Sequence, residues 1–368
     1  MSAKPQKSLQ DNSRPCPDCE RDDSFVGRRT FLKATAAGTV AAVAAGGVGR
    51  ILLADEEPAE KKTPETLVKV LYDTLTEKQR GEVCFDWDYV DAKRDYGLLR
   101  TRVSNNWEIT RHHVLSDFYT AEQKQLVREI WEGIINPEWH SRVDKQLKDD
   151  SGGPFGAQQS IAIFGKPGED KFQFAMTGRH MTLRCDGNSA EHVAFGGPIF
   201  YGHAASGFDE KPGHPGNVYW PQAQAANKVY EMLDERQRKM AAVPRSPDEE
   251  KVGFLGTDGA LPGIPLSEMS SDQRELVQQT LGKLIEPYRQ GERDEVLACL
   301  KAQGGLDACS LAFYIDSDFD KDGTWDNWRL EGPSFVWYFR GKPHVHVWVH
   351  VADSPDVELN SYQNSIGV

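Results

Sequence analysis

A run of alternating polar and valine residues near the C-terminal end is the feature that most constrains the fold of this chain. The run is His344-Val345-His346-Val347-Trp348-Val349-His350. Because side chains two apart on a β-strand share a face, the histidines and the tryptophan point one way and the valines point the other. Imidazole is a poor core residue but a good metal ligand or proton carrier. The run therefore predicts a strand with one face in the core and a functional site on the other.

The residues before this strand predict its partner. The apolar run 333–339 leads into Arg340-Gly341-Lys342-Pro343, where a two-residue turn that begins with Gly would form an antiparallel hairpin. That turn sets a register in which the polar residues face aromatic rings, the pairs being His344 with Phe339, His346 with Trp337 and Trp348 with Phe335. The histidine row is therefore expected beside an aromatic row.

Length and composition indicate a soluble globular protein. The chain has 368 residues, which allows one large domain or two ordinary ones, and 27% of the residues are charged. The formal net charge is -13. An acidic surface repels nucleic acid and anionic membranes, so neither is expected as a partner.

The first 54 residues have the pattern of a twin-arginine export signal. Arg28-Arg29-Thr30-Phe31-Leu32-Lys33 precedes the apolar run 34–48, which is too short and too rich in Ala and Gly to form a membrane span of about 20 residues. Cleavage is expected after Ala54, with Ala44 as the alternative. We therefore expect an exported protein, periplasmic or extracellular, that uses the twin-arginine export machinery and has no membrane insertion after signal cleavage.

The rest of the chain divides by composition into three parts. Residues 55–65 are a charged linker, residues 66–353 a single α+β domain and residues 354–368 a C-terminal tail. An oxidising compartment permits Cys299 and Cys309 to pair. Twin-arginine export would require folding first, so the fold is not expected to depend on a disulfide.

One short phrase occurs four times and predicts four helix starts. Each copy has Thr, Asp or Ser followed three residues later by Gln, which is the spacing of a capping box. The caps and their glutamines are Thr76 with Gln79, Thr120 with Gln123, Asp234 with Gln237 and Ser270 with Gln273. The copies come in two pairs, so we expect a helix-loop-helix unit that is used twice.

Strand-like sequence lies between the two pairs and after the second one. The segments are 160–164, 171–175, 178–187, 311–315 and 325–330. In the third segment the residues expected in the core are Met181, Leu183 and Cys185, and those on the opposite face are His180, Thr182 and Arg184. Strands that are separated from helices along the sequence imply an α+β fold, with a mostly antiparallel sheet and the two helix-loop-helix units packed against it.

In this order, the phrases resemble an uncharacterised bacterial and fungal family, domain of unknown function 3500. The resemblance extends roughly from Leu67 to Asp353. The phrases that carry it are 75–80, Arg102 with Asn106-Trp107, 178–183, 233–238, 331–334 and 344–348. The family has no established activity, so the resemblance implies only a fold boundary and candidate positions.

The chain departs from the pattern of this family at two places. By resemblance, the family's Gly-His-His-Leu phrase falls on Gly178-Arg179-His180-Met181, so that Arg179 replaces one histidine. The closing His-x-His-x-x-x-Arg-Asp phrase falls on His344 and His346, with His350-Val351 where Arg-Asp is expected.

The histidine row supplies the candidate metal site. His344 and His346 are expected to bind one metal ion, completed by His180 or Glu331, because some β-sheet enzymes hold a metal with two or three histidines and a carboxylate. His350 is about 13 Å beyond His346 on an ideal strand, so it joins only if the strand bends. The candidate catalytic residues are Glu331, Arg179 and His350. A solvated or aromatic-stacked row of histidines without metal is the alternative.

Zinc, iron or manganese is the expected metal, because a protein that folds before export can load its metal in the cytoplasm, where copper is scarce. Calcium is possible at Asp318, Asp320 and Asp322, which alternate within the run 316–323. Arg329 stands where an EF-hand has its bidentate glutamate, so a hairpin loop with an Asp-Gly turn is the simpler interpretation.

The absence of three common sequence motifs argues against some kinds of chemistry. The chain has no nucleophile elbow, phosphate loop or dinucleotide fingerprint. Surface loops are expected to hold His112, His113, His203 and His214. We expect a metal-dependent enzyme, a hydrolase or oxidoreductase that acts on a small organic substrate, and a non-catalytic periplasmic protein that binds a ligand or metal is the alternative.

Overall fold

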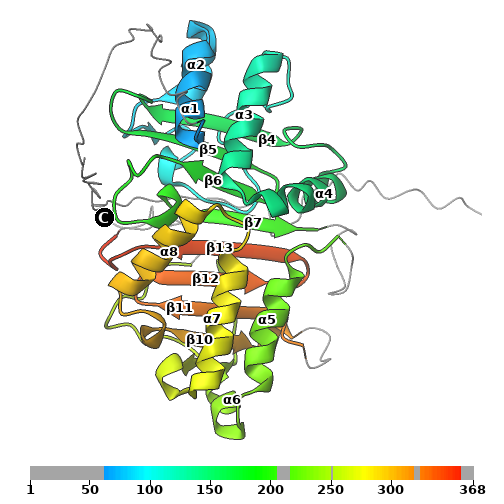
Figure 1. Cartoon of the computed structure of the whole chain (residues 1–368), viewed down its shortest axis with the longest axis vertical. Helices are drawn as coiled ribbons and strands as arrows, with labels where there is room; N and C mark the ends of the chain where they lie inside the picture. The colour runs from blue at the N-terminus through cyan, green and yellow to red at the C-terminus, as the bar shows by residue number, and fades with distance from the viewer. Residues whose placement is uncertain (1–61, 205–215, 250–251, 319–323, 358–368) are drawn as a thin grey trace, which may run out of the picture.

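The computed structural model describes residues 62–204, 216–249, 252–318 and 324–357. The twin-arginine phrase, His214, Asp320 and Asp322 lie outside these residues, so the export signal and the calcium loop stay predictions. In the described part, no helix is both long enough and apolar enough to cross a membrane. The architecture is α+β with a mostly antiparallel sheet, as the sequence predicted (Figure 1).

One open sheet of 11 strands runs through the molecule in the order β1-β4-β5-β6-β7-β13-β12-β11-β10-β8, with β9 also paired to β10. Its first half consists of β1 (Cys84–Phe85), β4 (Gln159–Gly165), β5 (Phe172–Gly178), β6 (Met181–Cys185) and β7 (Ile199–His203). Its second half consists of β8 (Ala242–Val243), β9 (Ile264–Pro265), β10 (Ser310–Tyr314), β11 (Asn327–Gly332), β12 (Phe335–Arg340) and β13 (Val345–Val351). The pairs β1·β4 and β10·β8 are parallel. A separate small sheet contains β2 (Val90–Asp91) and β3 (Gly97–Leu98).

The helices cover one face of this sheet (Figure 1). They are α1 (Pro64–Thr74), α2 (Glu77–Val83), α3 (Ala121–Ile134), α4 (His140–Ser151), α5 (Trp220–Glu231), α6 (Glu235–Ala241), α7 (Ser271–Ile285) and α8 (Gln290–Ala302). The main apolar core lies between helices and sheet. It includes Val345, Val347 and Val349, so the valine face of β13 is buried in the core as predicted.

The two halves of the chain repeat one arrangement. In each half two helices lead to a short edge strand, two more helices follow, and a run of antiparallel strands completes the sheet. The halves meet at the centre of the sheet, where β7 pairs antiparallel with β13. They also meet between α3 and α7, where Ile135 forms an antiparallel bridge with Tyr288. This central seam joins segments that are far apart in the sequence.

All four predicted capping boxes form, at the starts of α2, α3, α6 and α7. The glutamines also bond to one another, which the sequence did not reveal. The Gln79 amide donates to Oε1 of Gln123 at 2.8 Å, and the Gln123 amide donates back at 3.1 Å. Gln237 and Gln273 form the same reciprocal pair in the second half. Each glutamine therefore caps its own helix and ties it to the start of another.

The predicted register of the β12–β13 hairpin is wrong by three residues: His346 pairs with Arg340 instead of Trp337. The connection spans the four residues 341–344 instead of two. The pairs are His346 with Arg340, Trp348 with Tyr338 and His350 with Val336. Because side chains alternate along a strand, this shift places the predicted aromatic row on the core face. That row, Phe335, Trp337 and Phe339, packs in the main core.

The histidine face of the sheet is covered by the long segments that follow β1 and β8. Val103 from the first segment and Val252 from the second pack in one apolar cluster with Phe200, Tyr338 and Trp348. These segments bury the face that an uncovered sheet would expose to water. None of the four cysteines in the described residues forms a disulfide, so Cys299 and Cys309 are not linked in this structure.

Replacing Gln123 with Leu is expected to lower the free energy of unfolding by about 2–3 kcal/mol, because it removes a cap and leaves the buried Gln79 amide with the Phe118 carbonyl but without Gln123. Urea unfolding followed by circular dichroism measures this. Gln125→Leu on the exposed side of α3 is the control, with an expected change within about 0.5 kcal/mol. Equal effects of the two substitutions would contradict a stabilising role for the glutamine pair.

Candidate metal centre

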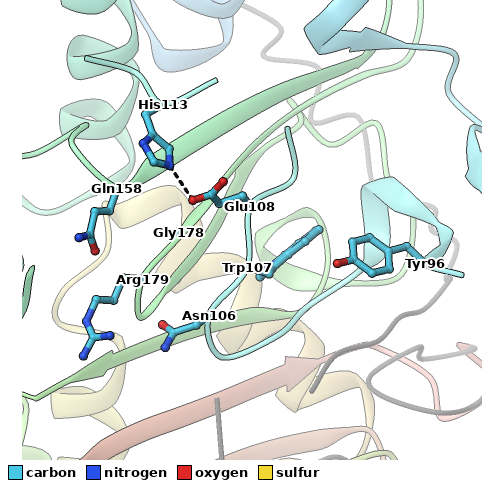
Figure 2. A pocket seen from close by; sticks show the side chains of 8 residues that line it. All are labelled: Tyr96, Asn106, Trp107, Glu108, His113, Gln158, Gly178 and Arg179. Atoms are coloured by element: carbon cyan, nitrogen blue, oxygen red, sulfur yellow. Dashed lines mark hydrogen bonds and ion pairs between the residues drawn. The ribbon is translucent and has the colours of Figure 1, made fainter. Parts of the chain in front are cut away.

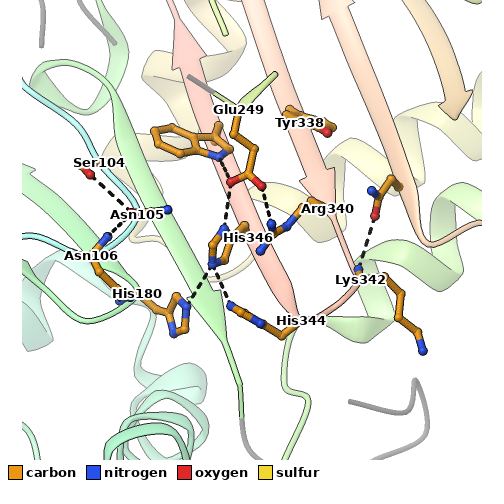
Figure 3. Close-up of polar contacts among 12 residues, drawn as sticks. Ser104, Asn105, Asn106, His180, Glu249, Tyr338, Arg340, Lys342, His344 and His346 are labelled. Carbon is orange, nitrogen blue, oxygen red and sulfur yellow. Dashed lines mark hydrogen bonds and ion pairs between the residues drawn. The ribbon is translucent and has the colours of Figure 1, made fainter. Parts of the chain in front are cut away.

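Three buried histidines converge at one end of the seam between β7 and β13. The potential ligand atoms of His180, His344 and His346 all lie within 4.8 Å of one another. Nε2 of His346 is 2.9 Å from Nε2 of His344 and 3.1 Å from Nε2 of His180 (Figure 3). Nitrogens that share a tetrahedral metal with bonds of about 2.0–2.1 Å are about 3.3 Å apart. The three rings therefore lie close enough to hold one metal ion.

Strand pairing brings the rings together. His346 of β13 pairs with Gly202 of β7, and the Gly202 amide donates to the His180 carbonyl at 3.2 Å. A Cβ added at Gly202 would lie 3.0 Å from Cδ2 of His180. Glycine at this position therefore gives the His180 ring room to approach His346 across the intervening strand.

His180 lies in the turn between β5 and β6, one residue before the start of β6, and not within a strand as predicted. Its φ is +50°, in the left-handed region that few non-glycine residues adopt. The His180 amide donates to Oδ1 of Asn106 at 2.8 Å, and this bond holds the turn against the segment after β1. Beyond it, Met181, Leu183 and Cys185 pack in the core as predicted.

Asp150, at the end of α4, orients the His180 ring. Nδ1 of His180 lies 2.6 Å from Oδ2 of Asp150, and Nε of Arg179 donates to Oδ1 at 3.1 Å. Burial alone would raise the pKa of Asp150, but His180 and Arg179 lower it below its usual value. An ionised carboxylate accepts the Nδ1 proton, so Nε2 of a neutral His180 carries a lone pair.

Glu249 orients the His346 ring in the same way. Its Oε2 lies 2.8 Å from Nδ1 of His346 and accepts from Nε1 of Trp348 at 3.0 Å. Its Oε1 forms an ion pair with Arg340 at 2.6 Å (Figure 3). The Nε2 lone pair of His346 therefore faces that of His180.

Burial keeps the rings of His180 and His346 neutral. It lowers the pKa of His180, although Asp150 opposes the shift, and it lowers the pKa of His346 well below the usual value with help from Arg340. Neutral imidazole is the form that ligates a metal. Histidines whose second nitrogen is bonded to a carboxylate are typical of metal sites, where the carboxylate fixes the tautomer and raises ligand basicity.

The other two candidate residues, Glu331 and His350, lie in a different polar group. Glu331 pairs with Val336, which pairs with His350, so the two lie in one row across three strands. Burial raises the pKa of Glu331 to about 7 despite its ion pair with Arg329. Burial, with Arg329 and Arg184, lowers the pKa of His350 to about 3. The structure thus brings His180 to His344 and His346, but brings neither Glu331 nor His350 to them.

A pocket of about 520 Å³ is lined in part by Gly178 and Arg179, the two residues before His180 (Figure 2). Its lining is mainly polar and comprises Tyr96, Asn106, Trp107, Glu108, His113, Gln158, Gly178 and Arg179. Two of these residues, Asn106 and Arg179, also support His180: Asn106 accepts from its amide, and Arg179 shares Asp150 with its ring. The pocket wall and the metal centre therefore have common parts.

The expectation of a surface loop is wrong for His203, whereas His112 and His113 lie outside the named helices and strands and are partly exposed. His203 is the last residue of β7 and is fully buried. His113 lines the pocket and lies 2.6 Å from Oε1 of Glu108. His112 stacks on Phe118 with a centroid distance of 3.6 Å. Sequence spacing gave no signal for these contacts.

Fold and site thus define an α+β protein with a candidate three-histidine metal centre. The chain belongs to the family described as "Protein of unknown function (DUF3500)", whose model matches residues 58–352. This confirms the family that the sequence phrases suggested. No curated protein and no solved structure matches the chain.

Asp150→Asn and Glu249→Gln are each expected to weaken metal binding by about 10- to 100-fold, because the neutral amides hold the ring tautomers less firmly. Competition with a chromophoric chelator measures the affinity. Asp149→Asn is the control, since Asp149 pairs with Lys145 on the surface of α4. Unchanged affinity in both variants would contradict the orienting role of these carboxylates.

Proposed function

We propose that this protein is an exported metal-dependent enzyme that acts on a small organic substrate. The observation that carries the proposal is the convergence of Nε2 of His180 and His346 at 3.1 Å while both Nδ1 atoms face carboxylates. Two lone pairs at this distance repel unless a cation lies between them. A metal ion shared with His344 supplies that cation and uses all three rings.

The donor set favours zinc, iron or manganese. Neutral imidazole suits zinc and iron, and loading in the cytoplasm before export disfavours copper. An ion held by three histidines keeps a coordination position for water or substrate, where it acts as a Lewis acid in hydrolysis or supports redox chemistry. The substrate is expected in the pocket that shares Asn106 and Arg179 with the support of His180.

Among the candidate catalytic residues, the proposal keeps Arg179, which lines the pocket. Glu331 and His350 carry no step in it, because they belong to the other polar group.

We also infer that each pair of glutamine-capped helices forms a helix-loop-helix unit used twice. The intervening segment of the first pair contains β1, β2 and β3, so the loop is itself partly ordered into strands.

A non-catalytic metal- or ligand-binding protein is the second candidate. The observation that favours it is burial: all three histidines are at most 2% exposed. A metal enclosed in this way could serve storage or structure. Cobalt substitution separates the two candidates, since an open coordination position lets azide change the visible spectrum, and a closed site does not respond.

The double substitution His344→Ala/His346→Ala is expected to abolish bound metal, because one imidazole remains of three. Elemental analysis of the purified full chain, with thermal unfolding as a check on folding, measures this. His192→Ala is the control, because His192 pairs with Asp353 away from the centre. Full metal occupancy in the folded double variant would show that the metal binds elsewhere.

The export proposal rests on the twin-arginine phrase. Arg28→Lys with Arg29→Lys is expected to leave the protein in the cytoplasm, because the export receptor reads the guanidinium pair and not charge alone. Cell fractionation and immunoblotting measure the location. Export of the unaltered protein from a strain that lacks the twin-arginine machinery would refute the proposal.

A further inference from the structure

We propose that the pocket beside His180 binds a small organic monocarboxylate, with Arg179 as the residue that binds its carboxylate. The inference rests on the proposed function, since it names the substrate class of the same site. It is carried by the terminal nitrogens of Arg179, by the charge of the proposed metal ion and by the two different ends of the pocket.

Arg179 has bonding capacity left for a ligand. Among the described residues only its Nε is bonded, to Asp150, and its side chain is 29% exposed. Its two terminal nitrogens make no bond to a described residue, and Arg179 is one of the residues that line the pocket (Figure 2). A guanidinium edge with two parallel N–H groups matches the two oxygens of a carboxylate.

A metal ion at the proposed centre would favour an anionic ligand nearby. Asp150 and Glu249 bond to the rings of His180 and His346, and Arg179 and Arg340 pair with these carboxylates. A bound cation is often the largest local charge in a site, and in a buried environment it attracts an anion strongly.

The opposite end of the pocket differs in charge. In Figure 2, Arg179 and Asn106 lie toward one end and the Glu108–His113 pair toward the other. The Glu108 carboxylate repels a second anionic group but accepts hydrogen bonds from hydroxyl or amino groups. The ligand is therefore a monocarboxylate with a neutral or donor-bearing tail, and the Asn106 and Gln158 amides are placed to add bonds to its polar groups.

Binding of a carboxylate at Arg179 would change the surroundings of the metal centre. Asp150 accepts from both Arg179 and the ring of His180, so a carboxylate on the outer edge of Arg179 lies one shared residue away from a metal ligand. A ligand bound to Arg179 is therefore linked to the metal centre through Asp150, and this link requires no change in the fold.

Isothermal titration of the metal-loaded full chain tests the proposal with benzoate and lactate as monocarboxylates, succinate as a dicarboxylate and benzamide as a neutral analogue of benzoate. At least one of benzoate and lactate is expected to bind. Benzamide and succinate are each expected to bind at least tenfold more weakly than the tighter-binding monocarboxylate. Arg179→Gln is expected to weaken monocarboxylate binding at least tenfold when it is compared with the unaltered protein at equal metal content. The control Arg236→Gln removes an exposed arginine that pairs with Glu268 and is expected to bind like the unaltered protein.

Arg179→Lys keeps the charge but loses the two parallel N–H groups of the guanidinium, so an intermediate affinity for monocarboxylates is expected. This variant replaces Arg179→Gln in the test if Arg179→Gln does not fold. The proposal is overturned if no monocarboxylate binds, if benzamide binds as tightly as benzoate, or if the folded Arg179 variants bind like the unaltered protein. Metal content is measured first on the same samples. A protein without bound metal contradicts the proposed function, whereas a metal-loaded protein that does not bind carboxylates contradicts only this inference.

Discussion

The hydrogen bonds between buried carboxylates and imidazole rings are the interactions on which the candidate site depends. Asp150 and Glu249 each take the Nδ1 side of a ring and so turn its Nε2 toward the same point. Without them the rings could rotate or change tautomer, and three adjacent histidines would be no more than polar residues in a covered sheet face. Each carboxylate is in turn held by an arginine, Arg179 or Arg340, so the orientation is fixed by a connected set of charges.

The fold supplies these parts from distant places in the sequence. β13 carries His346, the connection before it carries His344, the β5–β6 turn carries His180, and the carboxylates come from α4 and from the segment after β8. The seam between β7 and β13 brings the two halves together, and Gly202 lets one ring pass over it. The repeated arrangement thus yields an asymmetric centre, because the two halves contribute different elements to it.

Sequence reasoning recovered the local features and missed the long-range ones. The alternation in β13, the four helix caps and the core face of β6 depend on neighbouring residues, and these predictions were confirmed. The hairpin register was missed because five residues, and not two, separate the paired residues Arg340 and His346, and an odd difference in this number reverses the face that each residue of β12 takes. His180, His344 and His346 were named as metal ligands because histidine is unusual on a strand face. Glu249 could not be named, since it lies about a hundred residues from its partner in a segment without periodicity.

The most direct test of the account is a crystal structure of protein purified from its natural export route, with anomalous diffraction recorded at the absorption edges of zinc, iron and manganese. The account predicts one strong anomalous peak at about 2.0–2.2 Å from Nε2 of His180, His344 and His346, with Asp150 and Glu249 still on the far side of their rings. Clear density for the three rings with no peak between them, or a peak held by other residues, would contradict it.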